Sequence, residues 1–67
     1  MSKETNFLIY CIETYKRRKN MTGKQVINLF SQYKVSEYII RFFEALHTTG
    51  ENYIINDIDE YIAEQQA

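Results

Sequence analysis

Residues 22–47 read TGKQVINLFSQYKVSEYIIRFFEALH, and the apolar spacing of this stretch predicts two consecutive helices. Its first half predicts a helix over residues 23–33, because Thr22 is a good N-cap and Gln25, three residues later, completes a capping box. Placed at about 100° per residue, the apolar side chains of this helix share one face and the polar ones the other. The apolar face comprises Val26, Leu29, Phe30 and Tyr33.

The second half of the stretch predicts a helix over residues 37–47, with Ser36 as its N-cap. Its broad apolar face comprises Tyr38, Ile39, Phe42, Phe43 and Leu46. Only residues 34–36 separate the two helices, so the pair has the lengths of a helix-turn-helix. The sequence therefore predicts a helix-turn-helix-like centre.

A nucleic-acid-binding function is the alternative that this centre raises. The second helix of a DNA-binding helix-turn-helix lies in the major groove and contacts it with basic or amide side chains. The polar face of this helix comprises Glu37, Arg41 and Glu44. Because two of these side chains are carboxylates, they would repel the phosphates of DNA. A helix-turn-helix shape used for protein contact is the preferred interpretation.

The segment before this stretch predicts a helix from about residue 3 to residue 19, with a face made of Phe7, Leu8, Cys11, Ile12 and Tyr15. Ile9 and Tyr10 lie off that face, and Ile40 lies at the edge of its own. This is more apolar surface than one small core needs, and a contiguous exposed apolar patch marks a contact site. We therefore predict a candidate interaction surface at Ile9, Tyr10 and Ile40.

After the stretch, Gly50 is suited to a left-handed position that ends a helix. The β-branched and aromatic run Tyr53–Ile55 predicts a short extended segment. The only other segment that could pair with it is Met21-Thr22. A last helix is then expected to begin at Asn56 or Asp57.

Together these segments predict an all-α, compact domain of three to four helices spanning residues 1–67, with or without a minimal β-bridge. The expected core comprises Phe7, Leu8, Cys11, Ile12, Tyr15, Val26, Leu29, Phe30, Tyr38, Ile39, Phe42, Phe43, Leu46, Ile58 and Ile62.

Charge is separated along the chain. Residues 1–34 carry seven Lys or Arg against two Glu, whereas residues 35–67 carry one Arg against seven acidic residues. The net charge is only −1, so no global field favours nucleic acid or a membrane. The basic run Lys16, Arg17, Arg18 and Lys19 is a candidate contact for an anion or an acidic partner. The alternative is that it complements the macrodipole at the end of its helix.

No constellation for catalysis or metal binding is visible. One His and one Cys cannot supply a four-ligand zinc site, and no glycine-rich phosphate loop exists. We expect no enzyme activity, no cofactor and no small-molecule substrate. Cys11 lies in an apolar run and is expected to be a buried, reduced thiol, which fits a cytoplasmic protein. The run Phe7–Ile12 is too short to span a membrane or to act as a signal peptide.

The chain resembles a family of short uncharacterised bacterial proteins, domain of unknown function 3791. The most specific segment is Leu46-His47-Thr48-Thr49-Gly50, followed by Tyr53-Ile54-Ile55 and Asp57-Ile58-Asp59. The resemblance also covers Phe7–Glu13, Tyr15-Lys16, Met21–Lys24, Leu29-Phe30, Tyr33 and Tyr61-Ile62. It assigns no catalytic residue, and it implies a partner-binding or antitoxin-like role.

The resemblance also draws attention to a polar cluster around the Gly50 turn. His47, with Thr48 or Thr49, is expected to form a hydrogen bond across the turn, and Asp57 or Asp59 is the natural acceptor. This cluster would be structural rather than catalytic.

For function, the sequence favours a small protein-interaction module. Its partner would be a second copy of the chain, as a homodimer, or a separately encoded protein to which it is accessory or antitoxin-like. The alternative is a nucleic-acid-binding protein of the helix-turn-helix type.

Overall fold

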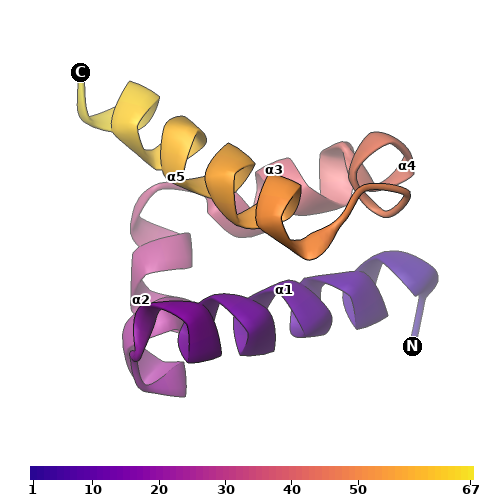
Figure 1. Cartoon of the computed structure of the whole chain (residues 1–67), viewed down its shortest axis with the longest axis horizontal. Helices are drawn as coiled ribbons and strands as arrows, with labels where there is room; N and C mark the ends of the chain where they lie inside the picture. Colours follow the sequence, from indigo (N-terminus) through magenta and orange to yellow (C-terminus); the bar gives the residue numbers. More distant parts are fainter.

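The computed structural model describes residues 1–67 and contains five helices and no strand. The helices are α1 (Lys3–Lys19), α2 (Gly23–Gln32), α3 (Val35–Arg41), α4 (Phe43–Leu46) and α5 (Glu51–Gln66). In Figure 1, α1 and α5 lie along opposite edges of the view, and α2 runs across the end where α1 finishes. The predicted all-α class is confirmed.

The hydrophobic core draws on α1, α2, α3 and α5. Its buried cluster comprises Cys11, Tyr15, Val26, Phe30, Val35, Ile39, Ile54, Ile55, Ile58 and Ile62. Phe43 and Leu46 are buried beside α3. Of the expected core residues, Phe7, Leu8, Ile12, Leu29 and Tyr38 are only partly buried. Phe42 is 43% exposed, so its assignment to the core was wrong.

Capping side chains fix the ends of the first two helices. The backbone N–H of Gln25 donates to Thr22 Oγ1, and the N–H of Thr22 donates to Gln25 Oε1, which confirms the predicted capping box. Ser2 accepts from the N–H of Thr5 at the start of α1. Asn20 ends α1 in the left-handed region with φ 54°, a position that Asn tolerates well.

The predicted helix over residues 37–47 is two shorter helices. Lys34 has φ 58° and starts α3 without a side-chain cap, so Ser36 is inside the helix rather than its N-cap. This earlier start buries Val35 completely. Phe42, at φ −104° and ψ 24°, then interrupts the helix between α3 and α4.

The expected extended segment Tyr53–Ile55 and its bridge to Met21-Thr22 do not form. Gly50 is extended, with φ −81° and ψ 167°, and acts as the N-cap of α5 rather than as a left-handed stop. The last helix therefore begins at Glu51 and not at Asn56. Its buried face comprises Ile54, Ile55, Ile58 and Ile62. Because helical geometry buries all four side chains on one face, tertiary packing outweighs the local β-propensity.

Candidate functional site

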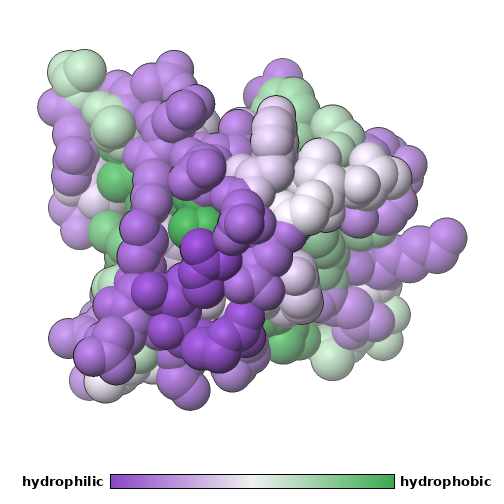
Figure 2. All heavy atoms as spheres, in the orientation of Figure 1, coloured by the Kyte–Doolittle hydropathy of each residue, from purple (hydrophilic) through white to green (hydrophobic).

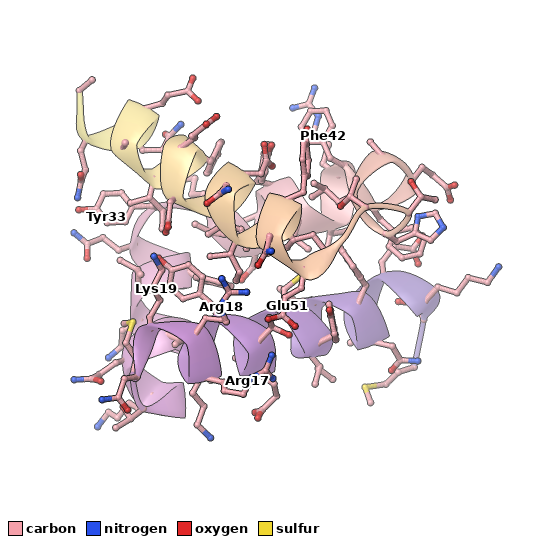
Figure 3. All side chains as sticks on the ribbon, viewed as in Figure 1. Arg17, Arg18, Lys19, Tyr33, Phe42 and Glu51 are labelled. Carbon is pink, nitrogen blue, oxygen red and sulfur yellow. The ribbon has the colours of Figure 1, made fainter.

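The basic run at the end of α1 is paired with carboxylates of α5. Arg17 Nη2 lies 2.9 Å from Glu51 Oε1, and Arg18 Nη1 lies 2.8 Å from Glu51 Oε2. Lys19 Nζ lies 2.6 Å from Asp59 Oδ2. Figure 3 shows Arg17, Arg18 and Glu51 pointing toward one another across the gap between the two helices. We call these five residues the α1–α5 clamp.

A tyrosine reinforces the clamp from the core side. The hydroxyl of Tyr15 donates to Asp59 Oδ1 at 2.7 Å, so Asp59 holds one donor from the core and one from Lys19 at the surface. Burial and this hydrogen bond to a carboxylate both raise the pKa of Tyr15, which therefore remains a donor. Tyr15 thus ties the clamp to the core, where its ring packs edge-on against Phe30 at 5.3 Å.

Because of the clamp, most cations of the basic run are not free to bind an external anion. Three of its four cations are engaged within the chain, and Lys16 lies 3.9 Å from Glu13. The separated charges of the sequence therefore meet inside one molecule. In Figure 2 the surface over the C-terminal half of α1 is hydrophilic. The ion pairs place acidic groups of α5 beside the basic groups of α1.

The ion pairs of Glu51 predict an acid-side loss of stability. Arg18 and then Arg17 hold the pKa of the Glu51 carboxyl below its usual value of 4.5. As the pH falls through 4.5, the unfolded chain takes up this proton before the folded chain does, so the contribution of Glu51 is lost. The wild type should therefore be more stable than Glu51→Gln near neutral pH, and the two should converge below pH 4.5.

Urea unfolding of both proteins across this pH range measures the effect. Glu60→Gln is the matched control, because Glu60 is also on α5 but forms no ion pair. A stability difference for Glu51→Gln that persisted in acid, or that Glu60→Gln reproduced, would contradict the assignment.

The three candidate interaction residues remain at the surface. Ile9, Tyr10 and Ile40 are 43%, 45% and 42% exposed. The ring of Tyr10 stacks on Phe7 at 6.0 Å, and Phe7 packs edge-on against Phe43 at 5.5 Å, so Tyr10 is held on a layer of aromatic rings.

Apart from the terminal Met1, sequence reasoning missed three further exposed large apolar residues. Ile27, Phe42 and Tyr53 are 55%, 43% and 58% exposed. Ile27 could have been found from its place on the polar side of its predicted helix. The other two depend on the break at Phe42 and on the early start of α5, for which the sequence carries no clear signal.

The expected polar cluster around the Gly50 turn does not form. His47 Nδ1 lies 2.8 Å from the carbonyl oxygen of Phe43, one turn back in its own helix, and the His47 ring stacks on the Phe43 ring at 4.4 Å. Thr48 and Thr49 likewise donate to nearby carbonyls, those of Ala45 and Leu46. The free carbonyls at a helix end are closer acceptors than any aspartate of α5.

The two aspartates have other partners. Asp57 accepts a hydrogen bond from the hydroxyl of Tyr38 at 2.5 Å, and Asp59 belongs to the clamp. Because α5 begins at Glu51, both residues lie past its first turn and away from the Gly50 turn. The prediction that either one binds His47 was wrong.

Nearly the whole chain matches a known protein family. The model of DUF3791, described as a protein of unknown function, matches residues 6–65. The chain belongs to the DUF3791 family. No curated protein and no solved structure matches it.

In this DUF3791 protein the helix-turn-helix-like pair α2–α3 presents little that suits DNA. The exposed residues of α3 are Glu37, Ile40 and Arg41, which give one cation against one carboxylate.

The structure offers no thiol or metal chemistry at its surface. Burial raises the pKa of the Cys11 thiol to about 12, so the group is neither exposed nor ionised. No three His, Cys, Asp or Glu side chains gather as a metal site would require. No helix is both long and apolar enough to cross a membrane.

Proposed function

We propose that this chain is a protein-interaction module that pairs with a second copy of itself through Ile9, Tyr10 and Ile40. The observation that carries the proposal is the exposure of all three side chains, at 42% to 45%, although the core is complete without them. Burying such side chains against a partner removes apolar area from water.

A second copy is favoured over a different partner by the size of the chain and by its charge. A domain of 67 residues has a small core, and small domains commonly gain stability by oligomerising. The net charge of −1 gives two copies little reason to repel. A standard interface takes about 800 Å² from each partner, under a fifth of the 4552 Å² surface of this chain.

An accessory or antitoxin-like complex with a separately encoded protein is the other form of this proposal, and it would use the same residues. We propose no enzyme activity, no cofactor and a cytoplasmic location. Nucleic-acid binding has less support, because Arg17, Arg18 and Lys19 already have carboxylate partners within the chain.

Replacing Tyr10 with Glu should convert the dimer to a monomer. The substitution places a charge where the proposed interface excludes water, and an unpaired charge there is costly. Tyr10 is nearly half exposed in the single chain, so the fold itself should tolerate the change. Light scattering coupled to size-exclusion chromatography gives the mass, and circular dichroism checks the fold.

Asn6→Glu is the matched control, because it adds the same charge at another exposed position of α1. This control should remain dimeric. If Tyr10→Glu kept the mass of the wild type, or if Asn6→Glu dissociated equally, the proposed interface would be wrong.

A further inference from the structure

The five acidic residues of α5 divide into two groups. Glu51 and Asp59 face α1 and are paired with its cations in the clamp. Asp57, Glu60 and Glu64 have no cationic partner within the chain. Their spacing of three and four residues places these three carboxylates on one stripe of the helix, away from the buried isoleucines. Part of the negative charge of α5 is therefore not neutralised by a cation of the chain.

Aromatic rings adjoin this unpaired stripe. The ring of Tyr38 stacks on Tyr61 of α5 at 4.1 Å and with 17° between the ring planes. The ring of Tyr38 also packs against that of Phe42, with 5.0 Å between the ring centroids. Tyr53 lies on the same stripe as the carboxylates and is 58% exposed. We call these rings and the three unpaired carboxylates the acidic–aromatic face.

The two parts of this face are physically connected. The Tyr38 hydroxyl donates to Asp57 at 2.5 Å, so the central ring of the stack holds one carboxylate of the stripe in place. A hollow of about 200 Å³ lies beside this carboxylate, and it is lined by Tyr53, Asn56, Asp57 and Glu60. In Figure 3, Phe42 lies at the edge of the molecule opposite Arg17, so the Phe42 end of this face is separate from the clamp.

One contact within the chain indicates which chemistry suits this face. The guanidinium of Arg41 lies over the Phe42 ring, 5.6 Å from its centroid. An aromatic face attracts a cation, and a planar guanidinium both stacks on rings and binds carboxylates through two N–H groups. Exposed rings beside unpaired carboxylates therefore complement arginine side chains.

We propose that the acidic–aromatic face binds an arginine-rich segment of another protein. Its three carboxylates would pair with the cations of the segment, and Tyr53 would stack with one of its guanidinium groups, as Phe42 does with Arg41. This proposal does not depend on the dimer contact through Tyr10.

A second copy of the chain does not fit this face. Three of the four cations in its only basic run are held in the clamp, and the other lysines are scattered singly at Lys3, Lys24 and Lys34. Nucleic acid does not fit either, because its phosphates would meet three carboxylates. The charge of the face thus selects a cationic protein segment.

Titration of the isotope-labelled protein with a nona-arginine peptide, followed by NMR at physiological salt, tests the proposal. The backbone amides of residues 53–64 and of α3 should shift. Glu60→Gln/Glu64→Gln should weaken peptide binding by about threefold to tenfold, the range expected for two exposed ion pairs. The matched control is Glu37→Gln/Glu44→Gln, which removes two exposed carboxylates from α3 and α4 and should change the affinity little.

The rings are tested separately with Tyr53→Leu, which keeps an apolar side chain but removes the ring. The wild type should bind nona-arginine more tightly than nona-lysine, and Tyr53→Leu should reduce this preference. Equal weakening by the two Glu double variants would show general charge attraction and overturn the proposal, as would the absence of binding or of any preference for arginine. Tyr10→Glu should leave peptide binding unchanged. The proposal for this face and the proposal for the dimer contact can therefore be refuted independently.

Discussion

Replacing Asn56 with proline should lower the free energy of unfolding by about 3 kcal/mol or more. Asn56 is exposed and lies in the interior of α5, which runs from Glu51 to Gln66. A proline at this position removes a backbone hydrogen bond to the preceding turn and clashes with the carbonyl of Asn52. The loss would be a large part of the stability of a chain of this length, at roughly 0.1 kcal/mol per residue. Urea unfolding followed by circular dichroism at the helical signal measures it.

This experiment separates the observed helix from the one that local sequence predicts. If Tyr53–Ile55 were extended and the helix began at Asn56 or Asp57, a proline at its first turn would be tolerated. The control Asn56→Ala should be neutral or slightly stabilising, because alanine has the highest helix propensity. Wild-type stability in the proline variant would contradict a helix that starts at Glu51.

Truncating Phe30 should have a comparable or larger effect. Phe30 is fully buried, and Phe→Ala substitutions in cores cost about 3 to 5 kcal/mol through lost transfer energy and the cavity that remains. The Phe30 ring also supports Tyr15, whose hydroxyl holds Asp59 of the clamp. Because a domain of this size has about 3 to 10 kcal/mol of total stability, Phe30→Ala should lose a large part of it and unfold at a much lower temperature and urea concentration than the wild type.

Thermal and urea unfolding of Phe30→Ala measure this loss against a control on the same helix. Ile27 is 55% exposed, so Ile27→Ala removes an apolar side chain of α2 without opening a cavity. It should cost well under 1 kcal/mol, within the usual range for a surface change. Similar losses in the two variants would contradict the assignment of Phe30 to the core.

Features that depend on neighbouring residues were predictable from the sequence. The capping box of Thr22 and Gln25 spans three residues, and the buried face of α2 follows directly from helical spacing. The segment Tyr53–Ile55 was wrongly predicted to be extended, because β-propensity considers only the residue types within the segment. The burial of Ile54 and Ile55 depends on Ile58 and Ile62, which extend the same face for two more turns of α5.

In the candidate site, too, features set by neighbouring residues were predictable and contacts between distant residues were not. Exposure of Ile9, Tyr10 and Ile40 followed from helical faces alone. The clamp did not, because Lys19 and Asp59 are 40 residues apart and no short-range pattern in the sequence indicates that α1 packs against α5. His47 was assigned a distant acceptor, whereas a carbonyl in its own helix lies within 2.8 Å.

The mass of the wild-type chain in solution shows whether the exposed apolar side chains of α1 and α3 form a contact between two copies. Sedimentation equilibrium at low and at high salt is the measurement, since an apolar contact persists when charges are screened. We predict twice the chain mass of 8.1 kDa under both conditions. A single species of 8.1 kDa under both conditions would contradict the claim.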